Sequence, residues 1–139
     1  MAAPDGQSVF LEAAPFFLVD DVVATAAYYR DKLGFTPGPF FGDPPGFVIV
    51  RRNTTRLVFR QVPESARPAA RPNADRMRHT LDAYIWVSDV DALAEELRRR
   101  GADILSEPEE SESAGRREMT VRDLNGYHLC FGFVLGWPD

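Results

Sequence analysis

The sequence predicts an α+β fold in which a unit of one strand, one helix and two or three further strands occurs twice, as a duplicated βαβββ arrangement. A strand followed by a capped amphipathic helix is indicated at residues 15–34 and again at residues 81–101. Matching positions lie 68 residues apart, as Val19 and Val87 or Asp21 and Asp89 show. Each helix pattern is followed by segments with the composition of strands and turns.

In the second copy, residues 81–87 are rich in aromatic and branched side chains and predict a strand. Its alternate positions form two sets, Asp82, Tyr84 and Trp86 on one side and Ala83, Ile85 and Val87 on the other. The second set is small or aliphatic and suits packing under a helix. The first set therefore faces something else.

The helix after this strand is expected to begin at Ser88, whose hydroxyl can accept from the free amides of the first turn. Leu93 and Leu97 mark its buried stripe, and Gly101 ends it. The remaining strands of this copy are predicted at residues 118–122 and 127–134, around an Asn-Gly turn signal. Residues 106–117, acidic and then basic, are expected to form an exposed loop.

The first copy follows the same plan. A strand is predicted at residues 15–19, a helix capped by Asp20 or Asp21 at residues 22–33, and a helix end at Gly34. Residues 36–46, rich in proline and glycine, predict a loop or an irregular edge strand, and residues 47–51 and 56–61 predict a hairpin. Residues 63–77 contain three prolines and three arginines and are expected to be a mobile crossover.

The composition limits the function classes. With 139 residues we expect a single domain covering residues 1–139, with modules at about 13–62 and 79–135 and a linker at 63–78. A net charge of −5 argues against a nucleic-acid partner, and the apolar runs are too short to cross a membrane. The N-terminus does not resemble a signal peptide, and the single cysteine, Cys130, fits a reducing compartment, so we expect a cytoplasmic protein.

The chain resembles the glyoxalase, bleomycin-resistance and extradiol-dioxygenase group, the vicinal oxygen chelate superfamily. The resemblance rests on DDVVATAAYYRDKLGF in the first half and on WVSDVDALAEELRRRGA and AGRREMTVRDLNGYHLCF in the second. The last of these looks most like the bleomycin-binding resistance branch. The resemblance implies two curved βαβββ modules whose mixed sheets form a concave surface, with helices on the convex side, and a homodimer whose subunits complete two clefts.

Enzymes of this group hold a divalent metal with one residue from each of four strands, typically histidine or glutamate. The resemblance assigns those four positions to Ala14, Val58, Asp82 and Cys130. Alanine and valine cannot bind a metal, and a register error of one residue does not restore the site. We therefore expect no metal and no other cofactor.

No base–nucleophile pair is visible in the sequence, so no catalytic residue is assigned. His79 is expected to be solvated, and His128 to face the concave side as a ligand contact or an exposed residue. Nothing adjacent in sequence lowers the pKa of Cys130, so we interpret it as a pocket wall.

The family geometry implies a concave face on which flat side chains can stack a planar, weakly polar ligand. Asp82 could pair with a cation or donor, Arg56 or Arg60 with an acid or carbonyl, and the loop aromatics could close over the ligand or pack at the dimer contact. The predicted ligand-binding residues are Phe16, Leu18, Phe40, Phe41, Phe47, Arg56, Val58, Arg60, Asp82, Tyr84, Trp86, His128 and Cys130.

Three functions remain open at this point. The first hypothesis is a metal-free, homodimeric protein that gives resistance by sequestering a planar or glycopeptide small molecule. The second is a lyase, isomerase or dioxygenase with a displaced metal site built from Asp82, Cys130, His128 and Glu118. The third is a protein whose cleft is plugged by its own side chains and which pairs with another protein.

Overall fold

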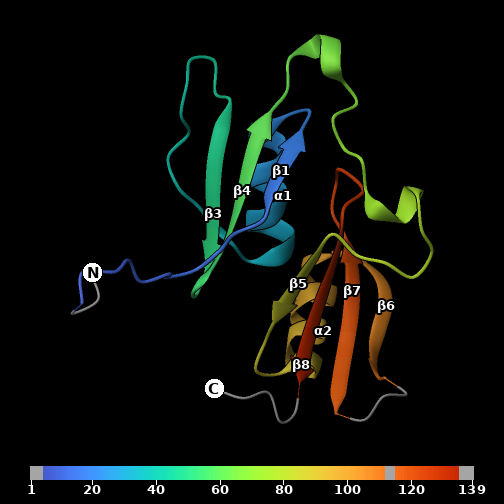
Figure 1. Cartoon of the computed structure of the whole chain (residues 1–139). Coiled ribbons are helices and arrows are strands. Elements are labelled where there is room, and N and C mark those ends of the chain that lie inside the picture. The colour runs from blue at the N-terminus through green and yellow to red at the C-terminus, as the bar shows by residue number, and fades with distance from the viewer. Residues whose placement is uncertain (1–4, 112–114, 135–139) are drawn as a thin grey trace.

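The computed structural model describes residues 5–111 and 115–134. The first module comprises β1 (Phe16–Val19), α1 (Val22–Leu33), β2 (Thr36–Pro37), β3 (Phe47–Arg52) and β4 (Thr55–Gln61). The second comprises β5 (Ala83–Trp86), α2 (Val90–Arg100), β6 (Asp103–Glu110), β7 (Arg116–Arg122) and β8 (His128–Val134). In Figure 1 the helix of each module lies behind its sheet, so both sheets turn their other face to the viewer.

The two sheets have the same topology. Their strand orders are β1-β4-β3-β2 and β5-β8-β7-β6, and in each the first strand pairs in parallel with the last while the other pairs are antiparallel. A parallel pair requires a long crossover, which the helix after the first strand begins. The α+β prediction of two βαβββ modules is confirmed.

Both helices begin at an aspartate and end at a glycine. The Asp21 carboxylate accepts a hydrogen bond from the Ala24 amide at 2.9 Å, and Asp89 does the same for Ala92 at 2.9 Å. The expectation that Ser88 caps the second helix is therefore wrong by one residue, because Asp89 has the extended backbone (φ −149°) of a cap. Gly101 ends α2 at φ 78°, a conformation that glycine adopts without strain.

The core lies between each sheet and its helix. Every second side chain along β1 and in the middle of β4 is buried, as the sequence pattern predicts. Ala83 and Ile85, predicted to pack under a helix, are buried and Val87 is half-buried. The other buried residues on the helix-covered faces include Phe17, Val19, Leu57, Phe59, Leu129 and Phe131. The opposite faces of both sheets carry no helix.

The modules meet through α1 and the turn between β7 and β8. The Tyr29 hydroxyl, fully buried, donates to the Asp123 carboxylate at 2.6 Å. The rings of Phe17 and Tyr127 lie 4.6 Å apart, and the Tyr127 hydroxyl donates to the Leu18 carbonyl at 2.7 Å. Burial raises the pKa of Asp123, although three hydrogen-bond donors stabilise its charged form.

Two segments differ from the expectation. The loop expected at residues 106–117 is wrong at both of its ends, because β6 extends to Glu110 and β7 begins at Arg116, while residues 112–114 lie outside the described residues. The acidic composition of β6 hid the strand: it is an edge strand whose exposed side chains alternate with half-buried ones.

The linker between the modules has structure of its own. It contains two 3-10 turns, η1 (Glu64–Ala66) and η2 (Asn73–Asp75). Hydrogen bonds hold it to both modules, since the Ala69 amide donates to Asp20 at 2.7 Å and the Asn73 amide to Asp82 at 2.8 Å. Within the described residues, no helix has the length and apolar character needed to span a bilayer.

Candidate ligand-binding cleft

The first sheet leaves an aromatic face uncovered. Phe17 is buried against α1, whereas its neighbours Phe16 and Leu18 keep 55% and 44% of their surface exposed. The ring of Phe16 lies 6.2 Å from that of Phe47, which lies 5.7 Å from that of Phe41. Three of the predicted aromatic residues therefore form one cluster on this face.

Beside this cluster the free face is basic. Arg56 and Arg60 of β4 are exposed and Val58 between them is half-buried, while the alternate residues face the helix. Arg56 forms an ion pair with Glu12 at 2.7 Å. Phe40, in the loop before β3, is 40% exposed. The free face of the first sheet thus combines flat apolar side chains with positive charge.

The second sheet presents Tyr84 and Trp86 on its free face. Their rings lie 4.9 Å apart at an angle of 57°, and Trp86 is 58% exposed. The Tyr84 ring crosses the neighbouring strand at Gly132, where a Cβ atom would overlap the hydroxyl and come within 2.6 Å of Cζ. Glycine at this position of β8 is therefore what lets the Tyr84 ring lie flat across the sheet.

The Tyr84 hydroxyl is buried close to the Glu118 side chain. It makes no hydrogen bond of normal geometry with any described residue. Burial raises the pKa of Tyr84 well above its usual range, and the nearby Glu118 carboxylate adds to the effect. The hydroxyl is protonated at neutral pH and available as a donor.

A cavity of about 510 Å³ lies on the same sheet and has Glu118 in its lining. Its floor is the free face of β8, β7 and β6, and η2 with the residues after it forms one wall. We call it the sheet cleft. Its lining comprises Ala74, Met77, Arg78, His79, Thr80, Leu81, Leu105, Ser106, Glu109, Ser111, Glu118, Thr120, His128 and Cys130.

Only His128 and Cys130 of the predicted site residues line the sheet cleft. The β6 and linker residues of this cleft were not predicted, because residues 106–117 were expected to form an exposed loop and residues 63–77 a mobile crossover. Thr120 could have been found from the alternation of residues 118–122, since it pairs with Cys130 across the sheet. His79 has a positive φ of 55°, which is uncommon for a residue other than glycine and marks a constrained backbone at the cleft wall.

The chemistry of Cys130 suits a residue that lines a pocket and does not suit a catalytic nucleophile. Burial, with the Glu118 charge as the second cause, raises the pKa of its thiol to about 11. A thiol with this pKa is almost entirely protonated at neutral pH, and the thiolate is the nucleophilic form. Its chemistry agrees with the interpretation from the sequence.

Asp82 has two backbone partners. Its Oδ1 accepts from the Asn73 amide and its Oδ2 from the His128 amide, each at 2.8 Å. The carboxylate thereby joins the linker to the start of β8. These two hydrogen bonds give the Asp82 carboxylate a structural role that requires no ligand. Its role as a ligand anchor stays a prediction.

The four positions that hold a metal in enzymes of the resembling group do not fit one here. Ala14 and Val58 offer no donor atom, Asp82 already accepts from two amides, and the Cys130 thiol is protonated. Across residues 5–111 and 115–134, no group of three or more His, Cys, Asp or Glu side chains could hold a metal ion.

A single chain does not unite the predicted site residues. The Phe16, Phe41 and Phe47 cluster belongs to the first sheet, whereas Tyr84 and the sheet cleft belong to the second, and no residue of the first module lines that cleft. Figure 1 shows the two free faces beside each other, turned the same way. In a single chain, each free face therefore forms only one wall of a possible binding site. A second surface is needed to enclose a ligand against it.

The fold is shared with many solved structures. TioX from Micromonospora sp. ML1 is similar at a TM-score of 0.69 and 19% identity, over 91% of this chain and 100% of that one. A superfamily member from Sphaerobacter thermophilus DSM 20745 is similar at a TM-score of 0.68 and 18% identity, over 90% and 98%. The virulence protein STM3117 from Salmonella typhimurium is similar at a TM-score of 0.64 and 17% identity, over 91% and 98%.

These identities are low enough that the likeness establishes the fold alone. No protein with a curated description matches the chain in sequence. The sequence pattern of one family, described as the Glyoxalase/Bleomycin resistance protein/Dioxygenase superfamily, matches residues 13–131. The match covers most of the chain, both sheets and both helices, and the chain therefore belongs to the glyoxalase/bleomycin resistance protein/dioxygenase superfamily.

Proposed function

We propose that this protein is a metal-independent, cytoplasmic binding protein of the bleomycin-resistance type, which sequesters a planar or glycopeptide small molecule in clefts completed by a second copy of the chain. The observation that carries the proposal is the pair of uncovered sheet faces, each with exposed aromatic side chains. Exposed apolar patches of this kind mark binding surfaces in soluble proteins. The helices occupy the opposite faces, so these aromatics do not pack against α1 or α2.

The two faces have opposite charge. Arg51, Arg56 and Arg60 stand on the free face of the first sheet, and Glu109 and Glu118 line the cleft on the second. Opposite charges on facing surfaces favour association and fix its orientation. The first sheet of one copy facing the second sheet of its partner would bring the Phe16 cluster over the sheet cleft and enclose a ligand between them.

Binding alone is sufficient for protection. A dissociation constant of about 1 μM corresponds to roughly −8 kcal/mol, which a few stacked rings in a preformed cleft can supply. The chemistry of the site favours binding over catalysis, since the Cys130 thiol is protonated and two of the family's four metal positions, Ala14 and Val58, lack donor atoms. A stoichiometric metal ion in protein purified without chelator, lost in an Asp82→Ala or Cys130→Ala variant, would instead support the enzyme hypothesis.

Ligand binding can be tested by titration. The chain has two tryptophans, so a Trp137→Phe background leaves Trp86 as the only reporter. We expect quenching or a shift of its emission with at least one member of a panel of bleomycin-type glycopeptides, enediynes and other planar antibiotics. A flat response across the panel, also by calorimetry, would contradict the proposal.

The shared cleft has a sharper test. Phe47→Ala damages the first sheet's face and Tyr84→Ala the second's, and each should weaken binding by itself. When the two variants are mixed and allowed to exchange subunits, about a quarter of the clefts combine two intact halves, because half of the dimers are mixed and one cleft in each is intact. Recovery of no high-affinity sites would exclude a cleft shared between copies, as would a monomer in sedimentation.

A further inference from the structure

The structure holds a second cavity, which has Trp86 in common with the free face of the second sheet but no residue in common with the sheet cleft. It has a volume of about 440 Å³ and lies between the two modules. We call it the seam cavity. Its lining comprises Leu33, Phe35, Arg52, Asn53, Thr54, Thr55, Ile85, Trp86, Val87, Ser88, Asp89, Ala92, Leu93, Glu96 and Phe131. None of these residues lines the sheet cleft, so the two cavities are separate.

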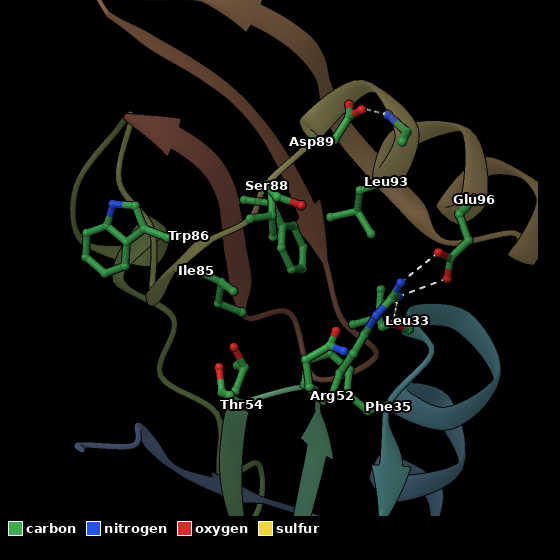
Figure 2. A pocket seen from close by; sticks show the side chains of 15 residues that line it. Leu33, Phe35, Arg52, Thr54, Ile85, Trp86, Ser88, Asp89, Leu93 and Glu96 are labelled. Carbon is green, nitrogen blue, oxygen red and sulfur yellow. Dashed lines mark hydrogen bonds and ion pairs between the residues drawn. The ribbon is translucent and has the colours of Figure 1, made fainter. Parts of the chain in front are cut away.

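The two walls come from different modules. Figure 2 shows Ile85, Ser88 and Leu93 of the second module across the cavity from Thr54 and Phe35 of the first. An ion pair closes one side, since both guanidinium Nη atoms of Arg52 contact the carboxylate of Glu96, at 2.9 and 2.7 Å. The modules are therefore joined at the side of the cavity and leave its centre open.

The floor of the seam cavity is apolar. Phe35, Ile85, Leu93 and Phe131 face it and are at most 9% exposed as whole residues. Exposed residues such as Thr54, Ser88 and Ala92 form its rim, so the cavity opens to solvent. The volume falls in the range of about 300–1,000 Å³ that is typical of sites for small molecules.

The rim restricts the charge of an occupant. The positive charge of Arg52 is already compensated, because it bonds Glu96 and also donates to the Leu33 carbonyl at 2.9 Å. Asp89 uses Oδ1 to cap α2, and no described residue donates to its Oδ2. A free carboxylate oxygen beside the Ser88 hydroxyl accepts from an N–H or O–H group and repels an anion.

We propose that the seam cavity is a second small-molecule site, which takes an uncharged, ring-bearing molecule with an N–H or O–H donor. The rings contact Phe35, Ile85 and Leu93, and the donor faces Asp89. Because the walls belong to different modules, an occupant contacts both and stabilises their packing. The site is independent of the sheet cleft and of any second copy of the chain.

N-phenylnaphthylamine is a suitable probe, since it is an uncharged aryl amine that fluoresces in apolar surroundings. Anilinonaphthalene sulfonate has the same rings and amine with an added anion. We expect the neutral probe to saturate one site per chain, to raise the melting temperature, and to bind at least about tenfold more tightly than the sulfonate.

Two plugging variants locate the site from opposite walls. Ala92→Trp fills it from α2 and Thr54→Trp from the turn between β3 and β4, and both positions are exposed enough for a large side chain. Glu95→Trp is the matched control, on the same helix but outside the lining. Thr120→Trp fills the sheet cleft instead.

Both plugging variants should lose at least about tenfold in affinity for the neutral probe, and both control variants should keep it. Circular dichroism identifies a variant that fails to fold. If one of the two plugging variants fails to fold, the probe affinity of the other one tests the proposal. The proposal is overturned if the folded plugs bind as the parent does, if Thr120→Trp abolishes binding, if the sulfonate binds equally well, or if the parent chain never saturates.

Discussion

Gly132→Ala tests the geometry on which the free face of the second sheet depends. In a strand, replacing glycine by alanine is by itself favourable by roughly 0.5–1 kcal/mol. Here the new methyl group would overlap the Tyr84 hydroxyl and approach Cζ within 2.6 Å. Overpacking of this kind costs roughly 1–3 kcal/mol, so we expect a net loss of about 0–2.5 kcal/mol in the free energy of unfolding.

The same substitution should have the opposite sign once the ring is gone. In a Tyr84→Ala background only the intrinsic gain of roughly 0.5–1 kcal/mol remains, because the other close atom, Glu118 Cγ at 3.2 Å, needs to move only slightly. The coupling between the two positions is then about 1–3 kcal/mol. Urea denaturation of the four proteins in the cycle measures it.

Spectroscopy gives an independent readout of the same perturbation. The rings of Tyr84 and Trp86 lie 4.9 Å apart, so displacing Tyr84 changes the surroundings of the indole. In a Trp137→Phe background, Gly132→Ala should therefore shift the Trp86 emission. Equal stability losses in the presence and absence of Tyr84, together with an unchanged spectrum, would refute the reasoning.

Three further substitutions test contacts that join the modules and the linker. Tyr29→Phe removes the hydroxyl from the buried Asp123 carboxylate and should cost about 1–3 kcal/mol in urea denaturation. Asp123→Asn should remove a pH dependence of the free energy of unfolding. Burial raises the folded-state pKa of Asp123 above the ordinary value of 3.8. Its protonation therefore stabilises the fold fully below pH 3.8, and this contribution is lost as the pH rises through the folded-state pKa. Asp82→Asn turns an NH₂ group toward the Asn73 or His128 amide and should cost about 1–3 kcal/mol in urea denaturation.

Each of these has its own control. Tyr28→Phe loses an exposed hydrogen bond to the Arg122 carbonyl and should cost less than Tyr29→Phe; equal costs would contradict the assigned role of Asp123. Parallel stability profiles of the parent and Asp123→Asn above pH 4 would contradict the raised pKa. A large loss of ligand affinity in a folded, stable Asp82→Asn protein would support the prediction that Asp82 is a ligand anchor, and unchanged affinity would contradict it.

The repeated local patterns made the fold predictable. Alternation in β1 separates buried Phe17 from exposed Phe16, and in β5 it separates buried Ile85 from exposed Trp86, as expected from the sequence. Strand and helix periods depend on neighbours a few residues away, so they can be recognised without knowing what the chain packs against. The edge strand β6 was missed because its exposed residues are acidic and give it the composition of a loop.

The candidate site was predictable only in part. The alternation of residues along β8 predicted that Cys130 faces the free side of the sheet, and it lines the sheet cleft. No neighbour in the sequence was expected to lower the pKa of its thiol, and that pKa is raised. The partners of Asp82 could not be predicted, since one lies in the linker and the other 46 residues along the chain. Hydrogen bonds of this kind depend on the path of the linker, which has no periodic pattern.

The sequence by itself thus determined the duplicated βαβββ units, the faces that their helices cover, and the lack of metal donors at Ala14 and Val58. Only the tertiary structure decided that Glu118 and Thr120 share a cavity with the linker. It also decided that Arg52 of one module meets Glu96 of the other beside an open space. The physical reason is range: propensity and periodicity act between near neighbours, whereas cavities form where distant elements pack and leave a gap.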